Sequence, residues 1–374
     1  MERSPNRDSN RRPGPAKAGT SRTKKVAALA VVALIVLVSI LGYQYLTSPT
    51  KPSTHITIGL SDATNGYWPV YIAKDSGMFE KYGLNATVAI LGGGRDVVIS
   101  LAAGQIQIGG VGTDSVVAAK LEELDVVQIG ATERERPFYL VTRPGIQSAE
   151  QLKGKVGGVI NVGVGLTYVA TATMLARLGL DPTKDVTLVG IAGGSAARLA
   201  AVQAGKIDFT LTSEVLRAKK LGLNVLFYVP EIIEGMPGNG YATSSKYLTQ
   251  NREIVKRFIK AVTEATKFFF DNKEDSKEIL GNWLKEKAPE TLEQHYQDWS
   301  RVALKIPMNN LAQVRNVLDA IAPFAPKAAN ADPRIFVDNS IIEELEREGF
   351  FKSIWGQAMG TTSSSSVHFI QARV

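Results

Sequence analysis

One segment of the chain occurs twice, about a hundred residues apart, and this repeat constrains the fold more than any other feature. The stretch AGQIQIGGVGTDS begins at Ala103, and AGKIDFTLTSE begins at Ala204, an offset of 101 residues. Each copy predicts a glycine-rich loop, a short helix ending at an Ala-Gly pair, a strand and a polar cluster, because Gly accepts the left-handed conformation that ends a helix. The repeat therefore predicts one βα unit used twice; chance similarity between two common βα units is the alternative.

Composition limits the chemistry that this chain can perform. With 374 residues, 44% of them hydrophobic, the chain can build one large or two medium domains. It has no cysteine, which excludes disulfides, thiolate metal sites and a cysteine nucleophile. The three histidines, His55, His295 and His368, are scattered. We therefore expect no metal site and no cofactor.

The positive charge is concentrated at the N-terminus. Residues 1–25 contain eight Lys or Arg and two acidic residues, so they account for six of the seven net positive charges. The remaining chain is nearly neutral, and we therefore expect no nucleic-acid partner.

The basic segment leads directly into an apolar one. Residues 26–46 read VAALAVVALIVLVSILGYQYL, close to the roughly 20 residues that cross a bilayer. Positive charge before the span predicts a cytoplasmic tail at 1–25, an uncleaved transmembrane signal anchor at 26–46 and an extracytoplasmic body. A cleaved signal peptide is the alternative. Residues 47–54 read as a Pro-bearing linker, and the Ser-rich residues 360–374 read as a disordered tail.

Strand and helix patterns alternate through most of the body. From His55 to about residue 243 the hydrophobic period switches repeatedly between two and 3.6, with one predicted helix over 67–83 that is entered near Pro69. Five helical patterns then follow, the last over 341–351. This order predicts an α/β protein with a helical C-terminal part.

Read in order, several segments of the body resemble the solute-binding proteins of nitrate/sulfonate/taurine-type ABC importers, a family that includes binders of thiamine-pyrimidine precursors. The resemblance extends from about residue 56 to about residue 350. The segments that carry it are GYWPVYIAKDSGMFEKYGLNATV, SLAAGQIQIGGVG, LVTRPGIQSAEQLKGKVGGV, ARLGLDPTKDVTLVGI, AAVQAGKIDFTLT and SSKYLTQNREIVKRFIKA. One departure is Gln107, since family members usually carry Asp there, as the second copy does at Asp208.

The resemblance implies a two-lobed periplasmic-binding-protein fold of type II, with the ligand in a cleft between the lobes. One lobe would contain residues 55–137 and 239–350, and the other residues 138–238. The two copies of the repeat would then be opposing walls of one site, at the carboxyl ends of strands where helix N-termini gather. The expected partners are a small organic solute (sulfonate-, taurine- or pyrimidine-like) and ABC permease subunits.

The polar clusters that end the two copies are the first candidate ligand-binding residues. They stand where a strand passes into a helix, so their hydroxyl and N–H groups either bind ligand or cap helices. The first cluster is Thr113, Asp114 and Ser115, and the second is Thr212, Ser213 and Glu214.

Further candidates lie in glycine-bearing loops. Gly66, Tyr67 and Trp68 follow the first strand, where the aromatic rings either stack on a flat ligand or form the floor of the lobe. Arg95 either grips an oxyanion or is a solvated loop residue. The carboxylates of Asp114 and Glu214 disfavour a small dianion, and so favour a zwitterionic or neutral solute.

The remaining glycine loop gives candidates for backbone contact with the ligand and no enzyme signature. Gly163, Gly165 and Thr167 precede a predicted helix, but the third glycine of a dinucleotide fingerprint is absent. Ser195 lacks the following Gly of a nucleophile elbow. We therefore expect no catalytic residue.

Two functional classes follow. The first is a membrane-anchored, extracytoplasmic solute-binding component of an ABC importer that closes around its solute by hinge motion and is not an enzyme. The second is a membrane-anchored sensor with the same fold, and neighbouring permease and ATPase genes would separate the two. A pyrimidine-synthesising relative would need reactive His and Cys residues that this chain does not offer.

Overall fold

The computed structural model describes residues 53–163, 165–192, 194–233, 235–323 and 325–356. The predicted cytoplasmic tail, transmembrane anchor, most of the linker and the Ser-rich tail lie outside these residues. Among the residues described, no helix combines the length and the apolar composition needed to cross a membrane.

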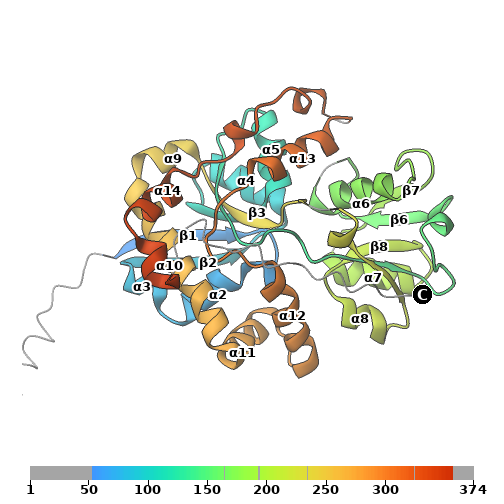
Figure 1. The fold of residues 1–374 in the computed structure, drawn as a ribbon, viewed down its shortest axis with the longest axis horizontal. Helices are drawn as coiled ribbons and strands as arrows, with labels where there is room; N and C mark the ends of the chain where they lie inside the picture. The colour runs from blue at the N-terminus through green and yellow to red at the C-terminus, as the bar shows by residue number, and fades with distance from the viewer. Residues whose placement is uncertain (1–52, 164, 193, 234, 324, 357–374) are drawn as a thin grey trace, which may run out of the picture. The chain divides into compact units, whose positions relative to one another are not determined.

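The first of two five-stranded sheets is built from the two ends of the body (Figure 1). Its strand order is β2-β1-β3-β10-β4, with β1 parallel to β2 and β3, and β10 antiparallel to both of its neighbours. The strands are β1 (Thr54–Leu60), β2 (Leu84–Ile90), β3 (Ile108–Gly112), β4 (Val127–Ala131) and β10 (Asn239–Thr243). The late strand β10 thus lies between two early ones.

The second sheet repeats this plan with the middle of the chain. Its order is β7-β6-β8-β5-β9, with β6 parallel to β7 and β8, and β5 antiparallel to both of its neighbours. The strands are β5 (Tyr139–Thr142), β6 (Val156–Val159), β7 (Thr187–Gly190), β8 (Phe209–Thr212) and β9 (Asn224–Tyr228). The chain therefore passes from the first sheet to the second after β4 and returns before β10.

The repeat in the sequence is a repeat in the structure. Strand β3 begins at Ile108 and β8 at Phe209, which is the offset of 101 residues seen in the sequence. The preceding helices, α4 (Gly94–Ala102) and α7 (Gly194–Gln203), end at this same offset. The prediction of one βα unit used twice is confirmed.

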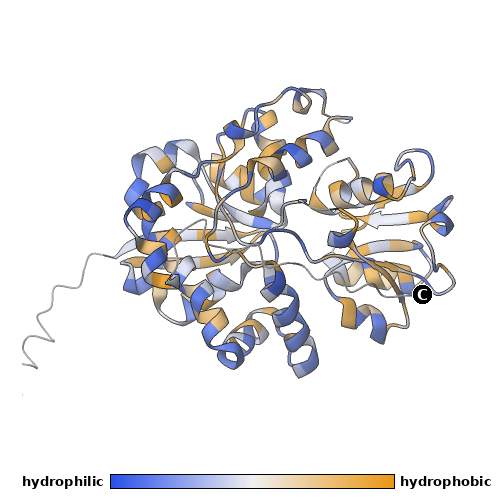
Figure 2. Cartoon of the chain, viewed as in Figure 1, coloured by the Kyte–Doolittle hydropathy of each residue, from blue (hydrophilic) through white to orange (hydrophobic). Residues whose placement is uncertain are grey.

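Helices cover both faces of each sheet, and buried apolar residues of helices and strands form shared clusters. Figure 2 shows that hydrophobic and hydrophilic residues alternate along many of these helices. On the first sheet, α2 and the C-terminal helices pack on one face, and α4 with α5 packs on the other. These elements are α2 (Trp68–Asp75), α3 (Met78–Lys81), α5 (Thr113–Leu121), α9 (Ser245–Gln250), α10 (Arg252–Asp271), α11 (Lys273–Leu284), α12 (Pro289–Val302), α14 (Ser340–Arg347) and α15 (Phe350–Trp355).

The second sheet has its own two layers. Helix α6 (Leu166–Arg177) packs on one face, and α7 with α8 (Val215–Lys220) packs on the other. Helix α13 (Leu311–Ile321) contributes Val314 and Leu318 to the core of this second sheet. The same apolar cluster includes Val117 of α5, so α13 packs against helices of both sheets, and the lobe boundaries stay a prediction.

Two predicted helices are interrupted, both at glycine. The expected helix over 67–83 is divided into α2 and α3, because Gly77 has φ 68°. The expected helix over 341–351 is divided into α14 and α15, because Gly349 has φ 72°. In both places a left-handed residue ends one helix and the chain turns before the next.

Candidate functional site

A cavity of about 360 Å³ lies where elements of the two sheets meet. The first sheet contributes the loop that follows β1, and the second contributes the polar cluster after β8 together with α8. The ends of α11 and α12 complete the wall. The lining residues are Ala63, Thr64, Asn65, Ser213, Glu214, Val215, Leu216, Arg217, Lys220, Leu284, Glu286, Thr291, Gln294 and His295.

The loop after β1 is fixed by a tight turn at the carboxyl end of its strand. The backbone N–H of Ser61 donates to the carbonyl of Gly110 at 2.9 Å, which continues the pairing of β1 with β3. Residues Asn65–Tyr67 then form a 3₁₀ turn. A larger residue at Gly66 would displace its neighbours, because a Cβ there would overlap the Asn239 amide nitrogen and lie 2.5 Å from Arg136 Nη1.

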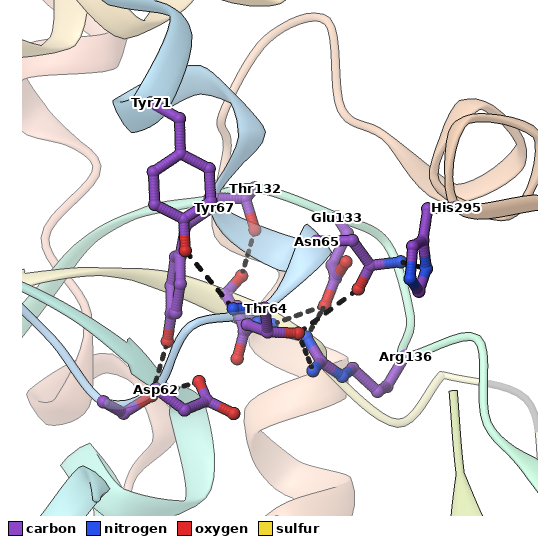
Figure 3. A network of polar contacts seen from close by, with 11 residues as sticks. Asp62, Thr64, Asn65, Tyr67, Tyr71, Thr132, Glu133, Arg136 and His295 are labelled. Atoms are coloured by element: carbon purple, nitrogen blue, oxygen red, sulfur yellow. Dashed lines mark hydrogen bonds and ion pairs between the residues drawn. The ribbon is translucent and has the colours of Figure 1, made fainter. Parts of the chain in front are cut away.

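The two segments that connect the sheets meet beside this loop (Figure 3). Thr132 donates through its hydroxyl to the carbonyl of Asn239 at 3.0 Å, and the Asn239 N–H donates to Glu133 Oε1 at 3.0 Å. Arg136 Nη1 lies 3.2 Å from the same carboxylate oxygen, and Arg136 Nη2 donates to Thr64 Oγ1 at 2.8 Å. One buried ion pair thus joins both connecting segments to the wall of the cavity.

The charge state of this pair follows from its burial. The side chain of Glu133 is fully buried, and burial raises its pKa even though the charge of Arg136 acts to lower it. Burial opposes the charge on Arg136, but the fields of Glu133 and Asp62 outweigh it and raise the pKa of the guanidinium. Arg136 is therefore a permanent cation at the junction of the two sheets.

One face of α12 closes the cavity on another side. The Asn65 amide lies 3.4 Å from His295 Nδ1, and burial lowers the pKa of His295, so the ring is neutral at pH 7. One turn further along, Asp298 accepts from Gln294 at 2.8 Å and from the Tyr139 hydroxyl at 3.0 Å. Since Tyr139 belongs to β5, α12 also contacts the second sheet.

The wall from the second sheet carries charges in pairs. Glu214 bonds to Arg217 at 3.1 Å, and Lys220 bonds to Glu290 of α12 at 2.8 Å. Ser213 lies beside them, 8% exposed and with a place in the lining. Because each cation faces a carboxylate, this wall suits hydrogen bonding to a polar solute more than attraction of a highly charged one.

Of the two predicted polar clusters, the second reaches the cavity. Ser213 and Glu214 line it, whereas the Thr212 hydroxyl accepts from the Glu214 N–H at 2.9 Å and so holds the turn before α8. The first cluster lies at the start of α5, where the hydroxyl of Ser115 donates to Asp114 at 3.2 Å and Thr113 is 2% exposed. The ligand role of both clusters stays a prediction.

Asp114 is the acidic residue of the first cluster, and burial perturbs its pKa. It is 3% exposed, and burial raises its pKa from 3.8 to about 6. The hydrogen bond from the Ser115 hydroxyl opposes that rise. Asp114 is not among the residues that line the cavity.

The aromatic candidates belong to the core of the first sheet. Trp68 is fully buried, with its ring 4.9 Å from Phe269 and 6.4 Å from Trp299. Tyr67 is also fully buried, and its hydroxyl lies 2.8 Å from Ser61 Oγ. Both side chains lie in the apolar core of the first sheet, which agrees with the alternative that they form the floor of the lobe. Arg95 lies exposed on α4.

The glycine loop before α6 has the backbone that its residues predict. Gly163 and Gly165 have φ of 82° and 93°, backbone angles that residues other than glycine rarely adopt. The Thr167 hydroxyl accepts from the N–H of Ile160 at 3.0 Å, so it stabilises the loop itself. None of these three residues lines the cavity of the described structure.

Several lining residues had no signal in the sequence. Thr64 and Asn65 directly precede the predicted Gly66. The sequence therefore identified this loop as part of the site, but not its polar side chains. Gln294 and His295 lie about 80 residues beyond the second polar cluster, and only the packing of α12 brings them to it. Within the described part of the chain, no group of three or more His, Cys, Asp or Glu residues could hold a metal ion.

Comparison with known proteins gives concordant results. A family model described as NMT1/THI5 like matches residues 65–276. A protein of Brucella abortus (strain 2308), which carries a provisional name as a binding protein, is 24% identical over 244 residues, covering 59% of this chain and 69% of that protein.

Solved structures show the same fold. The periplasmic aliphatic sulphonate binding protein SsuA of Escherichia coli has a TM-score of 0.64 and 19% identity, covering 76% of this chain and 92% of that one. The periplasmic nitrate-binding protein NrtA of Synechocystis PCC 6803 has a TM-score of 0.62 and 15% identity, covering 81% and 89%. The two-sheet body thus has the α/β fold of periplasmic binding proteins.

Proposed function

Because this chain belongs to the NMT1/THI5-like family, we propose that it is the solute-binding component of an ABC-type import system, with the cavity between its two sheets as the solute site. The observation that carries this proposal is the composition of the cavity wall. Residues 63–65 follow β1 of the first sheet, and residues 213–217 follow β8 of the second. A site shared by two sheets couples occupancy to their relative position, as hinge closure requires.

The solute is a small organic molecule, of sulfonate-, taurine- or pyrimidine-like character. A volume of about 360 Å³ is at the low end of the range for small-molecule sites. Structural relatives are named as binding aliphatic sulphonates and nitrate. The lining combines hydroxyls, amides and a neutral imidazole with paired charges and the carboxylate of Glu286, which favours a zwitterionic or neutral solute over a small dianion.

The body acts outside the cytoplasm, tethered by residues 26–46, and passes its solute to permease subunits. This placement is supported by the basic and apolar order of the N-terminal segments. Solute capture needs no bond to be made or broken, so we propose a binding protein and not an enzyme.

Native mass spectrometry of the full-length chain, purified in a mild detergent without denaturation, tests the proposal. We expect an additional mass of a small organic solute that disappears after unfolding and refolding. The variant Ala63→Trp should reduce its retention at least tenfold, because Ala63 lines the cavity and a tryptophan there would fill part of it. The control Ala176→Trp changes an exposed residue of α6. Equal retention by both variants would place the solute elsewhere.

A further inference from the structure

A chain of hydrogen bonds leads from Arg136 to the ring of His295, and the cation at its start sets the direction of each bond (Figure 3). Arg136 Nη2 donates to Thr64 Oγ1 at 2.8 Å. An arginine side chain has only donors, so the Thr64 oxygen accepts and its own proton is left to donate. The Thr64 hydroxyl donates to Asn65 Oδ1 at 3.2 Å. The Asn65 amide nitrogen then lies 3.4 Å from His295 Nδ1.

This direction decides which ring nitrogen of His295 carries the proton. An amide nitrogen is a donor, so Nδ1 accepts, and a neutral imidazole that accepts at one nitrogen carries its proton on the other. Burial lowers the pKa of His295, so the ring has one proton at pH 7, on Nε2. Among the residues that the structure describes, Nε2 has no hydrogen-bond partner, and His295 lines the cavity.

The opposite orientation of the Asn65 amide would leave one donor without an acceptor. Thr64 Oγ1 would then accept from both Arg136 and Asn65, and the Thr64 proton would have no acceptor in the described part of the chain. Thr64 is 8% exposed and Asn65 is 3% exposed, so the loss of a hydrogen bond here is costly. The bond pattern therefore favours the orientation that leaves the His295 proton on Nε2.

The preceding residue of α12, Gln294, presents the opposite polarity. Its amide nitrogen donates to Asp298 Oδ1 at 2.8 Å, and the Tyr139 hydroxyl donates to the same oxygen at 3.0 Å. Asp298 is 1% exposed, so this oxygen is a fixed acceptor that holds the Gln294 amide in one orientation. The Gln294 carbonyl oxygen has no partner among the described residues, and Gln294 lines the cavity.

The charge beside these two groups is negative. Glu286 lines the same cavity, and its carboxylate accepts from the N–H groups of Lys287 and Ala288, each at 2.8 Å. Glu286 forms no ion pair with any residue of the described ranges, unlike Glu214 of the facing wall, which is paired with Arg217. An anionic group of a solute would be repelled at this place. The wall therefore suits a neutral group that has both an acceptor and a donor.

We propose that the chain of hydrogen bonds from Arg136 holds His295 as its Nε2–H tautomer. In this subsite the His295 N–H and the Gln294 carbonyl bind a neutral amide or ureide group of the solute, whose carbonyl oxygen accepts and whose N–H donates. The assignment of the solute rests on the proposed function. Arg136, Thr64 and Asn65 act through His295, so they are positioning residues of the site.

A merely structural network is the competing explanation. The same bonds hold the connecting segment that contains Arg136 to the loop after β1. Such a role needs the contacts but not their direction, so it makes no demand on the position of the ring proton. The tautomer of His295 therefore separates the two explanations.

NMR of the full-length chain in detergent, with ¹⁵N only in histidine, measures this tautomer. The chain has three histidines, so His55→Gln and His368→Gln assign the signals. We expect His295 at pH 7 to have Nδ1 unprotonated and Nε2 protonated. Asn65→Asp removes the amide donor and should move the proton to Nδ1. A proton on Nδ1 in the unsubstituted chain, or an unchanged tautomer in Asn65→Asp, would overturn the proposal.

A second variant tests the role of the hydroxyl and keeps the test decisive if Asn65→Asp does not fold. Thr64→Val removes the link to Arg136, so the Asn65 amide can adopt both orientations, and we expect a mixture of the two tautomers. Thr249→Val, at an exposed position of α9, is the matched control and should leave the tautomer unchanged. A single Nε2–H tautomer in Thr64→Val would show that Arg136 does not position the ring.

The solute assignment is tested with the molecule that co-purifies with the full-length chain. His295→Phe should reduce its retention in native mass spectrometry roughly twofold to tenfold, because one hydrogen bond is lost. His295→Gln should reduce it less, since an amide N–H can replace the Nε2–H donor. Equal retention by His295→Phe and the unsubstituted chain, or a co-purified solute whose only polar groups are anionic, would overturn the subsite and leave the proposed function standing. A chain that retains no solute contradicts the proposed function, while the tautomer still decides the positioning role.

Discussion

The replacement Asp114→Asn should stabilise the protein at neutral pH and not at acid pH. Asp114 is 3% exposed, and burial raises its pKa from 3.8 to about 6. The folded state therefore binds more protons than the unfolded state between these two values, so the free energy of unfolding falls as pH rises through this window. Above about pH 6 the full cost of the buried carboxylate is present.

The size of the effect follows from the two pKa values. One pH unit corresponds to about 1.4 kcal/mol, so a rise from 3.8 to about 6 amounts to roughly 3 kcal/mol. Asparagine is never charged and avoids this cost, although its amide oxygen is a weaker acceptor for the Ser115 hydroxyl, which donates to Asp114. Relative to the unsubstituted chain, we therefore expect Asp114→Asn to raise the free energy of unfolding at pH 8 by about 2–3 kcal/mol more than at pH 4.

Urea unfolding of both proteins at pH 4, 6 and 8 measures this difference. Comparing one variant with itself across pH cancels any packing change that the substitution causes. Asp96→Asn, at an exposed position of the neighbouring α4, is the control and should show little change between pH 4 and 8. A stability change in Asp114→Asn that is the same at all three pH values would refute the reasoning, because it would mean that the carboxylate is not held at a raised pKa.

Three further outcomes are expected. Gly66→Ala should lower stability by about 1–3 kcal/mol in thermal melts, since its Cβ would overlap Asn239; Gly190→Ala, which meets only a carbonyl oxygen at 3.5 Å, should cost less. Glu133→Gln should cost about 3–5 kcal/mol in urea unfolding, because it leaves Arg136 buried without its anion, and an unchanged midpoint would show that the ion pair is unimportant. Removal of residues 1–46 should leave a folded body that no longer sediments with membranes, and full membrane partitioning of that fragment would contradict a single anchor.

The repeat made much of the fold predictable. A helix followed by Ala-Gly and a short apolar strand is a local pattern, and two copies at one offset predict two equivalent sheet units, as α4-β3 and α7-β8 now show. The five C-terminal helical patterns also correspond to helices, because their apolar faces repeat over several turns. The breaks at Gly77 and Gly349 were missed, since a single glycine is tolerated in many helices and only its backbone conformation decides.

The site was less predictable, for a physical reason. Ser213 and Glu214 could be identified because they follow a strand directly, and strand ends form sites in open α/β sheets. Arg136 and His295 gain their positions from contacts with Thr64 and Asn65, which are 72 and 230 residues away along the chain. Local patterns carry no information on such pairs. Tyr67 and Trp68 show the reverse case, because aromatic residues in a loop suit a ligand and a core equally well.

Distance measurement across the cavity tests the central claim most directly. The chain has no cysteine, so Lys219→Cys on α8 and Lys287→Cys before α12 can be spin-labelled without interference, and both positions are exposed. Pulsed electron paramagnetic resonance would compare the solute-free chain with the same chain saturated with the solute that native mass spectrometry identifies. We predict a shorter and narrower distance distribution with solute, because the two walls close around it. An unchanged distribution at saturation would contradict a solute site shared by the two sheets.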